Sequence, residues 1–248
     1  MIKIENIDVY GWEAAIRGMR NPMNSWDKSD SIMCRGADGF EDCTVNAAGK
    51  CPRHGDFRHD IFCIGTNDHN LMMKLASAGP VHGKFRRMIT VTVDITAPLY
   101  WWKEFDTYKV GTVANSCSTM HKIHAKEFTL DDFSHEHLVN ERSGLVLTDR
   151  DIFPRNLLGA IVVELNKCRQ LFLGTGDKKY WWQMIQLLPS SYNQKRTVQL
   201  NYEVLSNIYE YRKNHKLDEW HTFCDWILTL PYSEIITCNC DSVTECDG

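Results

Sequence analysis

The regular alternation of side chains in residues 87–95 constrains the fold of this chain more than any other feature. In "RMITVTVDI", every second position from Ile89 onward is a branched apolar residue, and polar or flexible residues occupy the positions between. The apolar positions are Ile89, Val91, Val93 and Ile95. Alternation with a period of two is typical of a strand that buries one face. Pro98 ends this strand and suits the first turn of a following helix.

Other segments predict a mixed structure. "IKIENIDVYG" alternates in the same way and predicts an opening strand, and "WEAAIRGMRN" predicts a short helix that Pro22 stops. Helical periodicity predicts further helices at residues 66–79, 154–174, 178–189, 197–215 and 218–231. A few strands followed by helices indicate the α+β or mixed α/β class. We expect one domain over residues 1–237, with a Cys- and Gly-rich insertion at 29–62 and a polar tail at 238–248.

Composition excludes several classes of protein. With 248 residues, of which 43% are hydrophobic, the chain can build a full core without a disulfide or a metal. A net charge of −4 argues against general nucleic-acid binding. No stretch reaches the roughly 18 apolar residues of a membrane span, and the first residues lack the apolar centre of a signal peptide. We therefore expect a soluble, cytoplasmic protein without membrane partners.

The cysteines and histidines leave a metal site open. Ten cysteines without a secretory signal favour free thiols or metal ligands over disulfides. Residues 34–63 hold the candidate ligands of a structural zinc, Cys34, Cys43, Cys51 and Cys63. Their wide spacing departs from the usual close pairs, so free thiols are the simpler interpretation. A second group is either solvated or a zinc site, and it consists of His121, His124, His135 and His137.

A polar stretch follows the central strand and the aromatic residues Trp101 and Trp102. Asn115 and Ser118 are three residues apart and would lie together on a helix, where they could bind phosphate or carbonyl oxygens. The alternative is a tight helix crossing made of small residues. The two tryptophans fit a core or a subunit interface better than a stacking platform. Cys117 would act as a nucleophile only with a nearby base or cation.

The predicted helix at 197–215 places a cation on an apolar stripe. Asn201, Leu205, Ile208 and Arg212 are separated by four, three and four residues, which puts them on one helix face. A buried guanidinium requires an anionic or carbonyl partner. The partner is either an internal acid or a bound anion, unless Arg212 extends its charged end to water.

The order of these segments resembles the flavin-dependent thymidylate synthases, also called the thymidylate-synthase-complementing family. In that family, a strand, a proline and an aromatic helix precede the signature R-H-R-x-x-S-x-N-E-x-S-x-R. Here, residues 87–95 and Pro98 precede "YKVGTVANSCSTM". Asn115 then matches the asparagine of the signature, and Ser118 matches its second serine.

A second part of the resemblance lies near the C-terminus. The family has an asparagine and, eleven residues later, an arginine, on a helix that follows a Leu-Pro segment. Asn201 and Arg212 reproduce this spacing after Leu188 and Pro189. The resemblance implies a fold with a central antiparallel sheet flanked by helices. It also implies a homotetramer with sites shared between subunits.

The chain departs from the signature mainly in its cations. With Asn115 aligned, the three basic positions become Tyr108, Lys109 and Val110, the glutamate becomes Ser116 and the last arginine becomes Met120. Shifting the first half by one residue places Lys109 on the third basic position and Gly111 and Thr112 on a frequent glycine and the serine. Glu203 stands where the family often has an arginine. Compensating charge could come from Arg86, Arg87, Lys195 and Arg196.

The resemblance implies an enzyme of dTMP biosynthesis. Family members transfer a methylene group from methylenetetrahydrofolate to dUMP, and reduced FAD supplies a hydride. The implied FAD-binding residues are Lys109, Asn115 and Asn201, the implied dUMP-binding residues are Ser118 and Arg212, and no catalytic side chain is assigned. One alternative is a catalytically degenerate relative that has lost FAD and acts as a nucleotide-binding or interaction protein. Another is a zinc-stabilised protein that binds a partner through residues 29–62.

Overall fold

The structure is a computed structural model that describes residues 2–34, 61–139 and 153–238. The chain divides into two compact units. The first unit comprises Met1–Asn6, Val93–Lys109 and Ala114–Val198. The second unit comprises Ile7–Thr92, Val110–Val113 and Gln199–Gly248. The predicted tail beyond residue 238 and most of the predicted insertion, residues 35–60, lie outside the described residues.

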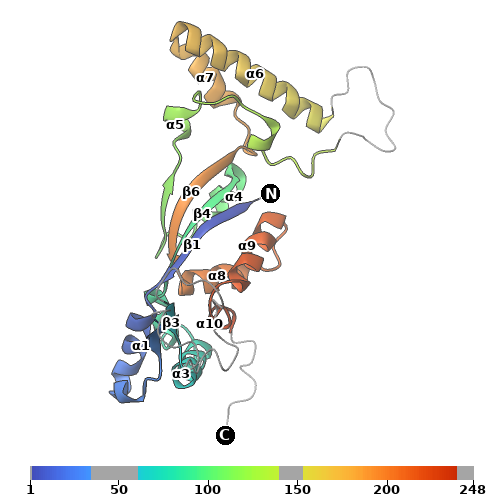
Figure 1. Ribbon diagram of the computed structural model, residues 1–248. Helices are drawn as coiled ribbons and strands as arrows, with labels where there is room; N and C mark the ends of the chain where they lie inside the picture. The colour runs from blue at the N-terminus through green and yellow to red at the C-terminus, as the bar shows by residue number, and fades with distance from the viewer. Residues whose placement is uncertain (1, 35–60, 140–152, 239–248) are drawn as a thin grey trace, which may run out of the picture. The chain divides into compact units, whose positions relative to one another are not determined.

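A four-stranded antiparallel sheet with strand order β1-β4-β6-β5 confirms the predicted α+β class (Figure 1). Its strands are β1 (Lys3–Tyr10), β4 (Thr90–Pro98), β5 (Val113–Ser116) and β6 (Asn193–Asn201). The predicted apolar positions are all 0% exposed: Ile89 lies just before β4, and Val91, Val93 and Ile95 lie within it. The alternation in the sequence therefore identified the most buried strand correctly.

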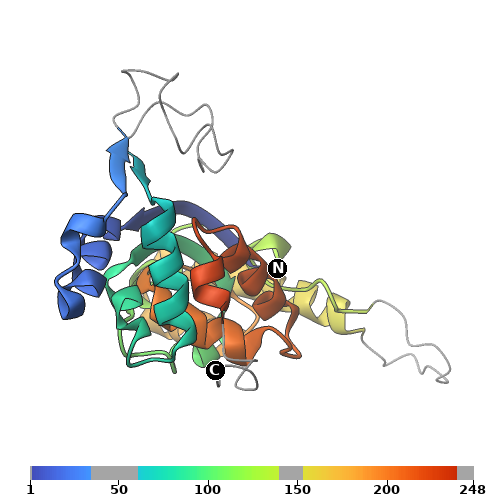
Figure 2. The same cartoon turned by 90° about the horizontal axis from the view of Figure 1, so that it is seen from below.

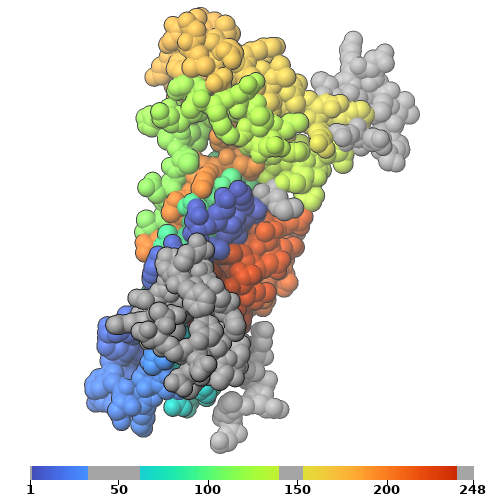
Figure 3. Space-filling view, in the orientation of Figure 1, coloured from blue at the N-terminus to red at the C-terminus, as the bar shows by residue number. Residues whose placement is uncertain are grey.

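The first unit also contains a helical hairpin and several short helices. These elements are α4 (Leu99–Phe105), α5 (Thr119–Lys122), η5 (Leu130–Asp132), α6 (Pro154–Thr175) and α7 (Lys178–Leu187). A capping box formed by Thr129 and Asp132 starts η5. Helices α6 and α7 pack on each other around Leu165 and Met184, and Figure 3 shows their outer surface in yellow and orange. Trp101 and Trp102 are buried in the core, as one of the alternatives predicted.

The second unit is mainly helical. Its elements are α1 (Trp12–Arg20), η1 (Asn21–Met23), η2 (Trp26–Lys28), β2 (Ile32–Cys34), β3 (Ile61–Cys63), α3 (Thr66–Ser77), η4 (Gly83–Met88), α8 (Tyr202–Arg212), α9 (Asp218–Leu228) and α10 (Glu234–Thr237). Strands β2 and β3 pair antiparallel at the two ends of the predicted insertion. Helix α3 lies beside α10, as Figure 2 shows. No helix among the described residues is long and apolar enough to cross a lipid bilayer.

A buried ion pair holds α1 and α3 together. The carboxylate of Asp68, which is 0% exposed, accepts a hydrogen bond of 2.6 Å from Nε of Arg20. It also accepts hydrogen bonds from the hydroxyls of Ser29 (2.7 Å) and Ser31 (2.6 Å) and from the backbone N–H of Asp30 and of Ser31. Burial alone would raise the pKa of Asp68, but the hydrogen bonds from Ser31, Ser29 and Arg20 outweigh it, and the pKa lies below its ordinary value.

We expect Asp68→Asn to destabilise the protein strongly, because it leaves the buried guanidinium of Arg20 without its counter-charge. Breaking one side of a buried ion pair typically costs about 3–5 kcal/mol. Urea unfolding measures the free energy of unfolding. The matched control is Asp27→Asn, since Asp27 is exposed in the same unit and should change stability by less than about 0.5 kcal/mol. Equal effects of the two substitutions would contradict this role for Asp68.

Candidate functional site

The segment that resembles the family signature does not form the predicted helix. Residues 113–116 are the edge strand β5, and all four of them are exposed. Asn115 therefore lies on a strand, while Ser118 is the N-cap of the short helix α5 and accepts a 3.1 Å hydrogen bond from the N–H of His121. The prediction that these two residues share a helix face was wrong, because pairing of β5 at the sheet edge replaces helical hydrogen bonds.

The predicted helix at 197–215 is also wrong at its start. Strand β6 continues to Asn201, with Val198 and Leu200 buried and the alternate residues Thr197 and Gln199 exposed. This alternation is the period of a strand. Asn201 is instead the N-cap of α8. Its Oδ1 accepts hydrogen bonds from the N–H of Glu203 (3.1 Å) and of Val204 (3.0 Å).

Within the second unit, the two family-like segments meet at Gly111. This glycine has a φ of +77°, a conformation that residues with a side chain rarely adopt. A Cβ at Gly111 would lie 2.9 Å from Nδ2 of Asn201 and 3.2 Å from Cγ2 of Val204. The absence of a side chain at Gly111 therefore allows the chain to approach the start of α8 closely. This contact joins residues that are 90 positions apart in the sequence.

Gly111→Ala should destabilise the protein more than the same change at Gly79. Gly79 also has a positive φ, +95°, but nothing lies within 4 Å of the position of its Cβ. Gly79→Ala should therefore lower the free energy of unfolding only by the cost of placing a side chain at a positive φ, about 1–2 kcal/mol. Gly111→Ala should add the clash with Asn201 and Val204. Thermal unfolding of the two variants measures the difference, and a smaller loss for Gly111→Ala would contradict the close approach.

The structure places the predicted ligand-binding residues in both units. Lys109, Asn115 and Ser118 belong to the first unit, and Asn201 and Arg212 belong to the second. Lys109 is exposed and makes no hydrogen bond or ion pair with the described residues. The guanidinium carbon of Arg212 lies 4.8 Å from the centre of the Trp220 ring. An indole face is a favourable partner for this cation.

Most of the cations suggested as compensating charge are bound to acids. In the second unit, Arg87 forms an ion pair with Glu203, with 2.9 Å between Nη2 and Oε1. In the first unit, Nζ of Lys195 lies 3.0 Å from the carboxylate of Asp94. Arg196 donates a 2.7 Å hydrogen bond to Asp106, and its guanidinium stacks 4.2 Å from the centre of the Trp102 ring.

Arg86 is the exception among these cations. It is 5% exposed, and its Nη1 donates to the hydroxyl of Ser206 at 3.0 Å. It is therefore part of the core of the second unit. An incoming phosphate would compete with existing partners at each of these four cations.

Asp94 is the most strongly perturbed acid of this group. It accepts hydrogen bonds from the hydroxyl of Thr197 (2.6 Å) and the amide of Asn6 (2.9 Å), in addition to its bond with Lys195. Together these bonds lower the pKa of Asp94 from 3.8 to about 2. The carboxylate is therefore ionised at every physiological pH and holds Lys195 in place.

This shift predicts how stability depends on pH. Because the folded pKa is lower than the unfolded value, Asp94 stabilises the protein fully above pH 3.8, and this contribution is lost as the pH falls towards about 2. The midpoint of urea unfolding should therefore decrease more steeply over this range in the wild type than in Asp94→Asn. Parallel curves for the two proteins would contradict the assignment.

No group of three or more His, Cys, Asp or Glu side chains that could hold a metal exists in the described part of the chain. Of the predicted zinc ligands, Cys43 and Cys51 lie outside the described residues, and Cys63 is buried at 0% exposure. Cys34 is paired with Ile61 in the β2–β3 ribbon. The proposed cluster of His121, His124, His135 and His137 forms no such group either. Cys117 is exposed as a free thiol.

Solved structures with the same fold have known ligands. No protein-family model and no curated protein matches the sequence. A flavin-dependent thymidylate synthase ThyX from Helicobacter pylori, complexed with FAD and dUMP, matches 94% of this chain and 98% of its own, with a TM-score of 0.60 and 14% identity. The chain has the fold of the flavin-dependent thymidylate synthases. A UMP/dUMP methylase, PolB from Streptomyces cacaoi bound with 5-Br dUMP, matches 96% of both chains, with a TM-score of 0.54 and 15% identity.

Sequence reasoning missed the partners of the cations in this ThyX-like fold. The acids Asp94, Asp106 and Glu203 carry no local signal for their contacts, because each of them bonds to a residue 90 or more positions away. No local sequence pattern predicted the close approach of Gly111 to Asn201 either. A glycine next to the signature was the only available hint.

Proposed function

We propose that this chain is a divergent flavin-dependent thymidylate synthase-like methylase that binds FAD and a pyrimidine deoxynucleotide and converts dUMP to dTMP with methylenetetrahydrofolate. The observation that supports this most is the likeness of fold, over at least 94% of the chain, to a ThyX complexed with FAD and dUMP and to a UMP/dUMP methylase. Both relatives hold a pyrimidine nucleotide or a brominated analogue. We assign the protein to the cytoplasm.

Individual side chains would have distinct roles in binding. Lys109, Asn115 and Asn201 are the proposed FAD ligands. The Oδ1 atom of Asn201 already accepts two backbone N–H groups, so its Nδ2 is the atom left to donate to a ligand. Ser118 and Arg212 are the proposed nucleotide ligands. Trp220 supports one face of the Arg212 guanidinium, which fixes the direction of its N–H groups.

These residues fit one phosphate better than they fit both a nucleotide phosphate and the diphosphate of FAD. FAD in its reduced form would supply the hydride of the reaction. Lys109 makes no hydrogen bond or ion pair with a described residue. The compensating cations Arg86, Arg87, Lys195 and Arg196 all have such partners. A site shared between subunits would add cations, and we propose a homotetramer for this reason. The fully exposed edge strand β5 supports a partner at that position.

A second candidate function is nucleotide binding without FAD. The observation that favours it is the pairing of Arg87, Lys195 and Arg196 with Glu203, Asp94 and Asp106, which leaves little positive charge for a diphosphate. Such a protein would bind a pyrimidine nucleotide as a regulatory or interaction protein and would not catalyse methylation.

Two measurements on freshly purified protein test the proposal. A bound flavin gives the protein a visible absorption band, and the enzyme should release tritium from dUMP labelled at C5 when FAD, a reductant and methylenetetrahydrofolate are present. A colourless protein that binds dUMP but releases no tritium would support the second candidate. A protein that binds neither FAD nor dUMP would contradict both.

Arg212→Gln provides the matched test of the nucleotide site. Losing the charged contact to phosphate should weaken dUMP binding by roughly tenfold or more, equivalent to about 1.4 kcal/mol. Isothermal titration calorimetry measures the dissociation constant. Arg155→Gln is the control, because Arg155 is exposed on α6, and it should leave dUMP binding unchanged. Equal affinities of the wild type and Arg212→Gln would remove Arg212 from the site.

A further inference from the structure

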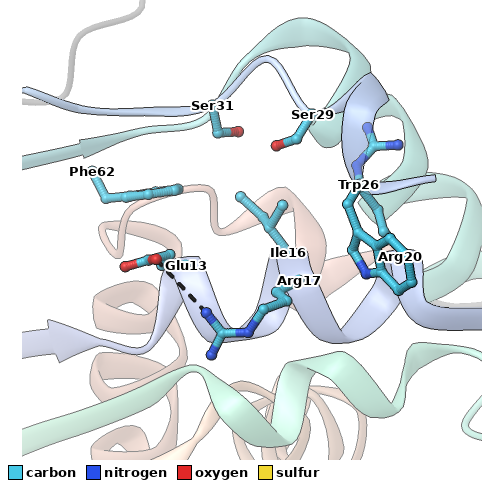
Figure 4. A pocket seen from close by; sticks show the side chains of 8 residues that line it. All are labelled: Glu13, Ile16, Arg17, Arg20, Trp26, Ser29, Ser31 and Phe62. Carbon is cyan, nitrogen blue, oxygen red and sulfur yellow. Dashed lines mark ion pairs between the residues drawn. The ribbon is translucent and has the colours of Figure 1, made fainter. Parts of the chain in front are cut away.

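A cavity in the second unit lies outside every segment that resembles the family signature. It has a volume of about 430 Å³, within the range of small-molecule sites, and it is formed by α1, η2, β3 and the residues after η2. Figure 4 shows Phe62 and Trp26 on opposite sides of the view with Ile16 between them. Two aromatic rings and an aliphatic side chain therefore give the cavity apolar walls suited to a flat ligand.

The walls of this cavity are fixed by the buried carboxylate of Asp68. Arg20, Ser29 and Ser31 line the cavity, and all three donate hydrogen bonds to Asp68. Each of the two hydroxyl groups already donates its proton to Asp68, so toward a ligand it can only accept a hydrogen bond. On the other side, Nε1 of Trp26 donates a 2.8 Å hydrogen bond to Asn21, which fixes the orientation of the indole. The cavity is therefore preorganised.

Arg20 offers a hydrogen-bond donor that the protein does not use. The residue is only 4% exposed, its Nε bonds to Asp68, and its Nη1 bonds to the carbonyl of Ser25 at 3.1 Å. Its Nη2 makes no hydrogen bond with any described residue. Nη2 is not among the fully buried atoms that lack a partner, so water or a ligand in the cavity can accept a hydrogen bond from it.

Arg17 supplies the positive charge. Asp68 neutralises Arg20, whereas the acid that pairs with Arg17 among the described residues is the exposed Glu13, at 3.7 Å on the same helix. An exposed pair at this distance is weak and is readily exchanged for a better anion. Arg17 and Arg20 are three residues apart on α1, so both face the same cavity.

We propose that this cavity binds a small planar aromatic anion, that is, a flat ring that carries a carboxylate or a phosphate. The ring lies over Ile16 between Trp26 and Phe62, and the anionic group pairs with Arg17, while Nη2 of Arg20 donates to water or to a second polar group of the ligand near Trp26. Two sources of this chemistry exist, an aromatic carboxylate and an aromatic phosphate. This site does not depend on the proposed methylase function, since none of its residues belongs to the nucleotide site.

Isothermal titration of the full chain with 4-hydroxybenzoate and with phenyl phosphate tests the proposal. One equivalent of at least one probe should bind, and dUMP should not displace it. Trp26→Ala and Arg17→Gln should each weaken binding by roughly tenfold or more, about 1.4 kcal/mol. Their matched controls are Trp182→Ala, at a tryptophan of similar exposure (44% against 51%), and Arg155→Gln. Both controls should leave binding unchanged.

The results of this titration either support or overturn the proposed site. Binding of one probe alone identifies the anionic group and supports the site. Failure of both probes to bind at millimolar concentration overturns the proposal. Binding that survives both Trp26→Ala and Arg17→Gln, or that dUMP displaces, overturns it too, because the probe then occupies another site. Both substituted residues are exposed on the surface, so circular dichroism should show an intact fold, and either variant suffices if the other fails to fold.

Discussion

The capping of α8 by Asn201 is the interaction on which the candidate nucleotide site depends. Strand β6 ends and α8 begins at this residue, and its Oδ1 satisfies two N–H groups that the first turn of a helix leaves unpaired. An N-cap of this kind is worth about 0.5–2 kcal/mol. The cap fixes where α8 starts, and hence the positions of Glu203 in its first turn and of Arg212 in its last turn.

The same side chain determines what can lie next to it. Nδ2 of Asn201 points at Gly111 so closely that a Cβ there would overlap it. In this way one amide group joins the end of the sheet, the start of a helix and the segment that resembles the family signature. The fold matches that of its structural relatives although the sequence identity to them is only 14–15%. Acids pair with Arg87, Lys195 and Arg196 in this chain, which leaves these cations little free charge for a ligand.

Particular residues explain how much of this could be predicted from the sequence. The alternation from Ile89 to Ile95 is a local signal, and the structure confirms the strand that it predicts. At 197–201 the prediction was a helix, and sheet pairing, a long-range interaction, decided for the strand. No local pattern predicted the role of Asp68, which in the structure is the buried partner of Arg20, 48 positions away. Partners of this kind depend on tertiary contacts that no local pattern encodes.

Photo-crosslinking with 5-bromo-dUMP tests whether a pyrimidine nucleotide binds next to the cap of α8. The label should attach to peptides within residues 107–120 or 193–212, and an excess of dUMP should prevent it. This result would place a pyrimidine nucleotide at the cap of α8 and at the adjoining signature-like segment, whether or not FAD is bound. Saturable, dUMP-competed labelling confined to other peptides, such as those of α1 and β3, would contradict the account.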